Sequence, residues 1–483
     1  MYLEAGQLLL QGKLPYVDFI DLNPPLIFYL STLPVLFSKS TGLDVITAFA
    51  IWTWLGCVIG IVLSALLFYG NKASSDSRYC GPIIFSLAAF NFLIGEWGEF
   101  GQRQHLAAVA LAPFIICRWW RSQNGKVPPL LGATVGLIFA VMIALVPQYL
   151  LIPVCTEAIF LFRSRKVKTL LAPEIIITIL FFLAYAIAFL NLPPFVKDSF
   201  LRRWAPLTML GYCAYNCSLS QIAGYPFFSG CIPLFICAAW LSLKRQCSLT
   251  MPLILWCIAA YLVGIIQMKG WPNHFVPLLL GTCLLASIQV EAAFNGEEKQ
   301  SMLSSTSTPR PRSAIFAMTA SIIAVCTLPG ILMRKFDRQW PLSELQTIRR
   351  ETSQGDQVII LSSNCSDIYP ALLQAARKNG SRYLFLFPLQ MLSWINENAS
   401  TEQQKVGAQL EEQKVLDELK EDIGRSQARL ILIPTGTSEQ EDPTSMFARL
   451  KKSGFIQKAM SHYRMQGYCQ GRKRTFAIWK LTN

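Results

Sequence analysis

Apolar runs separated by short polar turns fill the chain from residue 44 to residue 333. We expect ten of these runs to be membrane-spanning helices: 44–70, 82–95, 105–118, 127–145, 147–162, 169–192, 223–243, 251–268, 274–290 and 314–333. A membrane-spanning helix needs about 20 mainly apolar residues, and several of these runs are shorter than that. The pattern predicts a mainly α fold, a polytopic transmembrane helix bundle.

Two further stretches are partly apolar, but their patterns do not favour a membrane span. Leu26–Phe37 is too short to cross a bilayer, and we expect it to form a helix at the membrane interface. Phe195–Ile222 is amphipathic, and we expect it to lie along the interface with Arg202 and Arg203 against lipid headgroups.

The composition changes after residue 333. Short apolar runs predict strands at Val358–Ser362, Tyr383–Phe387, Leu430–Pro434 and Thr475–Leu481. Helical patterns between them predict helices at Tyr369–Asn379, Gln403–Ser426 and Thr444–Ser453. Strands that alternate with helices indicate a small α/β domain at the C-terminus.

The whole pattern divides the chain into five parts. These are an outer loop with interfacial helices (1–43), the transmembrane bundle (44–290), a Ser/Thr/Pro-rich cytoplasmic linker (291–313), a last span (314–333) and the α/β domain (334–483). The linker has no apolar periodicity and is expected to be flexible.

Composition supports a membrane protein and argues against nucleic acid as a partner. The chain is 53% hydrophobic and 15% charged, whereas a soluble domain carries about 25% charged residues. The net charge of +14 comes from Lys and Arg scattered over short turns, which is typical of the positive bias of cytoplasmic loops. The 14 cysteines lie mostly in apolar runs and show no metal-ligand spacing.

Lys and Arg are divided unevenly between the two alternating sets of turns. One set holds fourteen: Lys72, Arg78, Arg118, Arg121, Lys126, Arg163, Arg165, Lys166, Lys168, Lys244, Arg245, Lys299, Arg310 and Arg312. The other holds seven: Lys13, Lys39, Arg103, Lys197, Arg202, Arg203 and Lys269. Because positive residues are enriched on the inner side, the fourteen are assigned to the cytoplasm. The α/β domain is then extracytoplasmic, and the chain is predicted to be a multi-pass protein of the plasma (inner) membrane.

Four polar clusters meet on the predicted outer face, and two of them fall at the ends of spans. The first holds Glu96, Glu99, Arg103 and His105, and the second is the segment Lys269–His274. Charged residues at a membrane boundary usually mark a site, because each costs roughly 2.5–3.5 kcal/mol if it enters the hydrocarbon. A polar turn that only stops two helices from sliding would also explain the first cluster. Two clusters on one face favour a site.

This set of residues suits a reaction whose leaving group is a lipid-linked phosphate. A carboxylate can accept the proton of an attacking hydroxyl. Arg and Lys stabilise the charge that develops on a departing phosphate. A lipid substrate also explains a site placed where the membrane meets water.

Three segments resemble motifs of the GT-C membrane glycosyltransferases, of the protein O-mannosyltransferase and lipid A aminoarabinose transferase types. They are Gly12–Leu30, Gly101–His105 and Lys269–His274. The resemblance covers roughly residues 1–290. It departs from the usual motifs at Gln104, where Glu is common, and at Asn273, where Tyr is common.

The resemblance implies a polyprenyl-phosphate-sugar donor, a lipid, glycan or protein acceptor outside the cytoplasm, and inversion at the sugar carbon. It implies these site residues: Glu99 or Glu96 as the acid of the second outer loop, Asp18 and Asp21 in support, and Arg103, His105, Lys269, Trp271 and His274 for substrate binding. No cofactor is required by the residues, and assistance by a divalent metal stays open.

Two other functions stay open. One is a transporter or flippase of lipid-linked sugar, which the scarcity of ionisable residues in mid-span disfavours. The other is a non-catalytic assembly subunit with the same fold. The family carries a span and an acidic residue ahead of the first outer loop. We therefore expect the frame upstream of Met1 to encode one more apolar run of about 20 residues and an Asp or Glu.

Overall fold

The computed structural model describes residues 1–72, 74–96, 99–224, 232, 235–236, 239–240, 247–288, 343–436, 445–471 and 474–482. The chain divides into two compact units. The mixed unit contains residues 1–49, 190–215 and 335–483, and the helical unit contains residues 50–189 and 216–334. The expected linker 291–313, the span 314–333 and most of the span 223–243 lie outside the described residues. The mixed unit joins segments that the sequence pattern had placed in separate parts.

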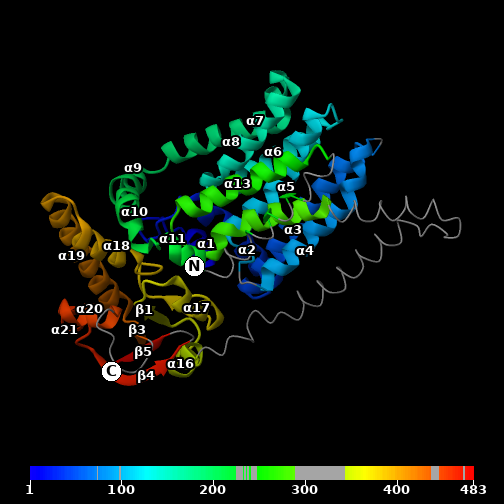
Figure 1. Cartoon of the computed structure of the whole chain (residues 1–483). Helices are drawn as coiled ribbons and strands as arrows, with labels where there is room; N and C mark the ends of the chain where they lie inside the picture. Colours follow the sequence, from blue (N-terminus) through cyan, green and yellow to red (C-terminus); the bar gives the residue numbers. More distant parts are fainter. Residues whose placement is uncertain are drawn as a thin grey trace. The chain divides into compact units, whose positions relative to one another are not determined.

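The helical unit is built from the apolar runs that the sequence predicts to be helices. It contains α3 (Val45–Tyr69), η1 (Ser75–Tyr79), α4 (Cys80–Glu96), α5 (Arg103–Ser122), α6 (Pro129–Ile143), η2 (Pro147–Leu150), α7 (Leu151–Ser164), η3 (Val167–Leu171), α8 (Pro173–Leu190), α11 (Leu219–Gly224), α13 (Thr250–Ile266) and η6 (Pro272–Phe275), which continues as helix to residue 288 (Figure 1). The predicted helix bundle is therefore confirmed for the described runs.

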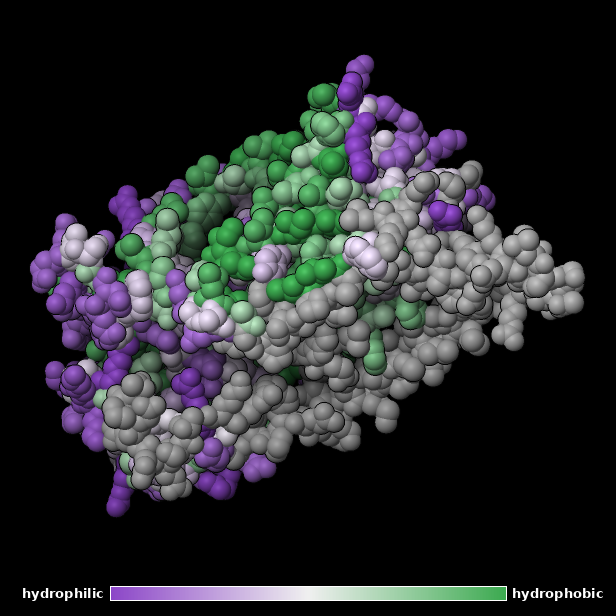
Figure 2. Space-filling view, in the orientation of Figure 1, coloured by the Kyte–Doolittle hydropathy of each residue, from purple (hydrophilic) through white to green (hydrophobic). Residues whose placement is uncertain are grey.

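Not all of these helices have the length of a membrane span. Among the described residues, α3 and α8 are long and apolar enough to cross a membrane, and three shorter helices (Pro129–Ile143, Thr250–Ile266 and Pro272–Ile288) are apolar. Figure 2 shows hydrophobic side chains over much of the visible surface of this unit. Only 11% of the apolar window of α8 is buried, so most of that helix presents apolar side chains outward.

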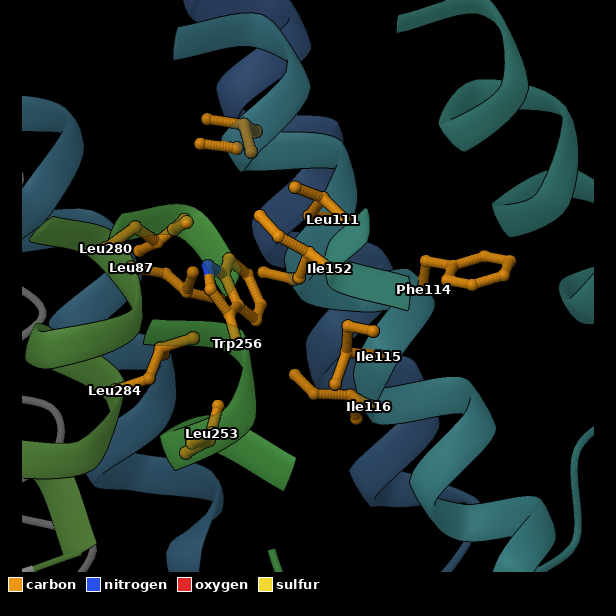
Figure 3. Close-up of a cluster of buried hydrophobic side chains, with 14 of the residues drawn as sticks. Leu87, Leu111, Phe114, Ile115, Ile116, Ile152, Leu253, Trp256, Leu280 and Leu284 are labelled. Carbon is orange, nitrogen blue, oxygen red and sulfur yellow. The ribbon is translucent and has the colours of Figure 1, made fainter. Parts of the chain in front are cut away.

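The core of the helical unit forms around α5. Nearly every residue of α5 from Gln104 to Trp120 is buried. Trp256 of α13 lies within the same cluster, with Leu111 and Ile115 of α5 across from it (Figure 3). Helices in a membrane associate through van der Waals packing of their side chains, so the closely packed α5 holds the helices that surround it.

Small residues bring α6 against the beginning of α8. A Cβ atom at Gly132 would lie 2.8 Å from Oε2 of Glu174, and one at Gly136 would lie closer still to the Glu174 backbone. The Thr178 hydroxyl also donates to the Gly136 carbonyl (3.2 Å). The Gly132-x-x-x-Gly136 spacing is typical of helices whose backbones approach closely in membranes.

Four charged side chains form a buried network that joins α5, α7 and α8. Arg118 is 1% exposed and binds Glu157 through two nitrogens (2.6 and 2.9 Å). Arg118 also donates to Glu174, which is 0% exposed (2.8 Å). Arg121 completes the network, because its Nε donates to the same Glu174 oxygen that Arg118 binds (3.3 Å). Two positive and two negative charges therefore balance inside the helix core.

The mixed unit contains the α/β domain together with residues 1–49 and 190–215. Its elements are α1 (Tyr2–Leu10), α2 (Leu26–Thr41), α9 (Pro194–Asp198), the π-helix η4 (Ser199–Trp204), α10 (Ala205–Gly211), η5 (Tyr212–Tyr215), α16 (Ser343–Glu351), β1 (Gln357–Ile360), η7 (Cys365–Asp367), α17 (Ala371–Gln374), β2 (Lys378–Asn379), α18 (Phe387–Asn398), α19 (Glu402–Ser426), β3 (Leu430–Gly436), α20 (Met446–Lys452), α21 (Phe455–Ala459), β4 (Tyr463–Gln470) and β5 (Thr475–Leu481). The predicted interfacial helix at Leu26–Phe37 and the long helix at Gln403–Ser426 are confirmed as helices.

Five strands form one sheet with the order β2-β1-β3-β5-β4. The pairs β2–β1 and β1–β3 are parallel, and the pairs β3–β5 and β5–β4 are antiparallel. The strands expected near 358, 430 and 475 are confirmed. The prediction of a strand at Tyr383–Phe387 is wrong, because this segment makes only a single bridge, with Ile20, before α18 begins at Phe387. The helix expected at Tyr369–Asn379 is reduced to α17, and β4 was not predicted.

The segment around Arg203 is bound to α19. The Arg203 guanidinium forms an ion pair with Glu411 and two hydrogen bonds with Glu418 (2.8 and 2.9 Å). Interpreting Arg203 as a lipid-headgroup contact is therefore wrong, since carboxylates of its own unit hold it. Arg202 is different, because its side chain is 81% exposed.

Candidate functional site

The buried His105 side chain contacts the turn between α4 and α5. The His105 ring is 0% exposed and lies near the rings of Phe90 and Phe100. Its Nε2 lies 2.8 Å from the Asn91 side-chain oxygen, and its Nδ1 accepts a hydrogen bond from the Gly101 N–H (3.1 Å). These two partners assign the neutral tautomer with hydrogen on Nε2. His105 therefore positions the turn, and its predicted part in substrate binding stays a prediction.

Glu99 lies in this turn, between the two helices. Its side chain is partly buried, and it forms no ion pair with any described residue. Burial raises the pKa of the Glu99 carboxyl to about 7, because the charged form loses hydration. A carboxyl with this pKa can accept a proton at neutral pH, which is what a general base needs. The side chain of Glu96 lies outside the described residues.

Arg103, at the beginning of α5, faces the loop that precedes α7. Its Nη1 lies 3.4 Å from the Leu145 carbonyl oxygen. Tyr149 of η2 is 0% exposed, and its hydroxyl donates to the His274 carbonyl oxygen (2.8 Å). The positive charges of Arg103 and Lys269 both act on His274. Residues about 170 positions apart in the sequence are thus brought to one place.

The loop between α13 and η6 buries the cation of Lys269. Met268 (φ 54°) and Gly270 (φ 62°) are in the left-handed region and fold the chain tightly around Lys269. The Lys269 side chain is 2% exposed, and its Nζ donates to the Asn216 side-chain oxygen. The Cys217 N–H donates to the Met268 carbonyl (2.6 Å). These contacts fix the ammonium group in the loop.

His274 carries a buried polar atom that needs a partner. It is 2% exposed, and its ring lies 5.4 Å from the Trp271 ring. Within the described part of the chain, no hydrogen-bond partner reaches Nδ1 of His274. Buried polar atoms in folded proteins are nearly always hydrogen-bonded, so a ligand or a water molecule is the natural partner at this position.

Asp18 and Asp21 belong to the mixed unit. Asp18 is exposed, and its carboxylate accepts a hydrogen bond from the Leu14 N–H (2.8 Å). Asp21 is 2% exposed, and its Oδ1 accepts from the N–H and side-chain nitrogen of Asn23 (2.9 and 2.6 Å). Both carboxylates therefore stabilise the turn ahead of α2. The structure brings Arg103, Lys269, Trp271 and His274 together in the helical unit, with Glu99 and His105 in that unit and both aspartates in the other.

Sequence reasoning did not identify Tyr149, Asn216 or Asn91. Asn91 and Tyr149 are polar residues inside runs that were considered only for hydrophobicity. Asn216 fell in a segment interpreted as interfacial. Their partners are more than ten residues away in the chain, so spacing alone could not pair them. In the described part of the chain, no group of three or more His, Cys, Asp or Glu side chains could hold a metal ion.

No family model and no curated protein sequence matches the chain. The structure is similar to that of ArnT from Cupriavidus metallidurans, at 12% sequence identity, covering 99% of this chain and 92% of that one. The TM-score is 0.50 for ArnT bound to undecaprenyl phosphate and 0.52 for the apo state. The archaeal oligosaccharyltransferase AglB from Archaeoglobus fulgidus also matches, at 12% identity over 99% of this chain and 69% of that one, with a TM-score of 0.32 too low to support an argument. The likeness shows that this chain shares its fold with ArnT, as the resemblance to transferases of that type led us to expect.

Proposed function

We propose that the protein is a multi-pass membrane glycosyltransferase that moves a sugar from a polyprenyl-phosphate donor to an acceptor outside the cytoplasm. The observation that carries the proposal is the buried His274 ring, whose Nδ1 lacks a partner among the described residues, within electrostatic range of the cations Arg103 and Lys269. Two cations and a hydrogen-bonding ring suit a phosphate ester. The fold is that of ArnT, which binds undecaprenyl phosphate, and this supports the same class of donor here.

The proposed reaction is a single displacement at the anomeric carbon. The acceptor hydroxyl loses its proton to the Glu99 carboxylate, and its oxygen forms the new bond to carbon. The bond between carbon and the phosphate oxygen breaks, and its electron pair leaves with the phosphate. Arg103 and Lys269 stabilise the negative charge that develops there. Attack from the side opposite the leaving group inverts the anomeric carbon.

The remaining candidates have more limited roles in this proposal. Trp271 lies beside His274 and would contact the sugar or the lipid by its ring. His105 and Tyr149 would act as positioning residues, because they contact the turn and the loop that carry Glu99 and His274. Asp18 and Asp21 would shape the first outer loop.

Transfer by the reconstituted protein tests this function. Proteoliposomes would receive a radiolabelled polyprenyl-phosphate sugar and a cell-envelope extract that supplies acceptors. We expect label to move from the lipid phosphate to an acceptor. Movement of the labelled donor across the bilayer without transfer would support a flippase. If the label is neither transferred nor moved across the bilayer, the result would support a non-catalytic assembly subunit.

The orientation is tested separately, because it places the site on the outer face. In a cysteine-free background, a cysteine at position 272 should react with a membrane-impermeant reagent in intact cells, since it lies in the loop that carries Lys269. A cysteine at position 165 should be protected until the membrane is opened. The opposite pattern would refute the predicted orientation.

A further inference from the structure

The turn between α7 and α8, residues 163–172, forms a basic cavity away from the proposed site. The cavity has a volume of about 610 Å³. Its walls include the cations Arg121, Arg165, Lys166 and Lys168, and none of the described residues that line it carries a carboxylate. The proposed reaction uses none of these residues. We refer to this segment as the basic turn.

Most of the positive charge at the basic turn is not neutralised within the protein. Arg121 is paired with Glu174. In contrast, neither Arg165, Lys166 nor Lys168 forms an ion pair with a carboxylate in the part of the chain that the structure describes. Lys166 contacts the neutral side-chain oxygen of Asn124. The three side chains are exposed, so an anion in the cavity would meet three cations.

The basic turn is fixed to the buried ion network. Arg118 donates through Nη1 to the Thr169 carbonyl oxygen (2.9 Å) while the same side chain binds Glu157 and Glu174. Arg165 adopts the left-handed backbone conformation (φ 54°) that ends α7. The network therefore anchors the backbone of the turn at Thr169. An anchored backbone loses less conformational freedom when the turn binds a ligand.

Exposed apolar side chains surround the cations. Phe162 is 80% exposed, Val167 70% and Leu171 72%. Two residues after Leu171, α8 begins with its largely outward-facing apolar surface. Figure 2 shows hydrophilic and hydrophobic side chains side by side at the top of this unit, where α7 turns into α8 in Figure 1. This mixture of cations and apolar groups matches the boundary between lipid headgroups and acyl chains.

We propose that the basic turn is a binding site for an anionic membrane lipid. The lipid phosphate would lie among Arg165, Lys166 and Lys168, and its acyl chains would pack on Val167 and Leu171. A charge bias between loops requires only cations near the membrane. It does not require a cavity, a turn tethered by Arg118, or apolar side chains exposed beside the cations, and this site has all three. The site does not depend on the proposed glycosyltransferase activity.

Lipid retention measured by native mass spectrometry tests the site. The purified protein would be exposed to equal amounts of phosphatidylglycerol and phosphatidylcholine in detergent, and the bound lipids counted. The test variant is Arg165→Gln/Lys166→Gln/Lys168→Gln. Each basic residue near an anionic membrane surface strengthens attachment by roughly fivefold, so we expect the loss of three to lower the preference for phosphatidylglycerol by about 100-fold.

The matched control removes three positive charges elsewhere. Lys405, Lys414 and Lys420 lie exposed on α19, and the variant Lys405→Gln/Lys414→Gln/Lys420→Gln should retain the wild-type preference. The double variant Lys166→Gln/Lys168→Gln leaves Arg165 and its left-handed backbone unchanged. It should lose part of the preference, and it keeps the test valid if the triple variant does not fold. Equal retention of both lipids by the wild type, or an unchanged preference in the test variants, would overturn the proposal. Displacement of the lipid by glycerol phosphate at comparable concentrations would also overturn it, since a free phosphate would then suffice.

Discussion

Glu99 and Glu174 are carboxylates of the same helical unit in opposite surroundings. Glu174 is fully buried and binds Arg118 and Arg121. Glu99 is partly buried, and within the described residues no cation pairs with it. A buried carboxylate with cations stays charged and links helices, whereas burial without a cation makes a carboxyl ready to take up a proton. The comparison separates a carboxylate that stabilises the fold from one suited to chemistry.

Glu99→Gln should give the largest effect on the reaction. The amide keeps the shape of the side chain but cannot accept a proton, and loss of a general base typically costs 10²–10⁴-fold in rate. Stability should be unchanged, because Gln needs no ion pair. Initial rates of sugar transfer measure the first effect and thermal unfolding in detergent the second. Asp198, whose side chain is 49% exposed, gives the control Asp198→Asn. Near-wild-type transfer by Glu99→Gln would refute the assignment of Glu99 as base.

Glu174→Ala should give the largest effect on stability. It leaves Arg118 buried with one carboxylate fewer, and breaking a buried ion network costs about 3–5 kcal/mol in the free energy of unfolding. Denaturant unfolding in detergent micelles measures this loss. Glu157→Gln should cost less, since Glu157 is 15% exposed. If Glu174→Ala unfolds like the wild type, the network does not hold α5 and α8 together.

Arg103→Ala and Lys269→Ala should each reduce transfer by about 10²–10³-fold, the effect expected for a donor that stabilises charge in the transition state. Transfer kinetics in proteoliposomes would show the loss. Arg202→Ala is the control, because Arg202 is 81% exposed and lies in the mixed unit. Activity that survives both of the first two changes would exclude these cations from the donor phosphate.

The smallest expected effect concerns the pH dependence of the transfer rate, which should show the raised pKa of Glu99. Burial raises this pKa to about 7, and only the deprotonated carboxylate can act as base. The rate of transfer should therefore fall as the pH drops below about 7, approaching tenfold per pH unit, and should level off above it. The residual activity of Glu99→Gln should lack this step. A wild-type profile flat between pH 5 and pH 8 would contradict the assignment.

The sequence predicted the helices of the bundle because apolar periodicity is a local property. It also predicted β1, β3 and β5, which are short apolar runs between polar turns. It missed β4 (Tyr463–Gln470), whose residues alternate between the two faces of an edge strand and include few apolar side chains. It misjudged Tyr383–Phe387, where an apolar run covers a turn and the beginning of a helix.

Ion pairs between residues far apart in the chain could not be predicted from the sequence. Arg118 follows an apolar run and was counted as a loop cation, but its partners Glu157 and Glu174 lie on other helices. The grouping of Arg103 with Lys269 and His274 was predicted, because both clusters fall at span ends on one face. Tyr149, whose hydroxyl donates to the His274 carbonyl, was not predicted, since nothing local distinguishes it from an interfacial tyrosine.

The mixed unit consists of three stretches of chain, 1–49, 190–215 and 335–483. All five strands of its sheet lie in the last stretch, so the ribosome makes the sheet only after the whole helical unit. At about 5–20 residues per second, α1 and α2 wait on the order of tens of seconds for the strands that complete their unit. During this interval α1 and α2 lack the strands of their unit, and partly folded chains of this kind are prone to aggregation. Synthesis therefore completes the helical unit first, and a nascent chain stalled before residue 335 would carry that unit without a folded partner domain.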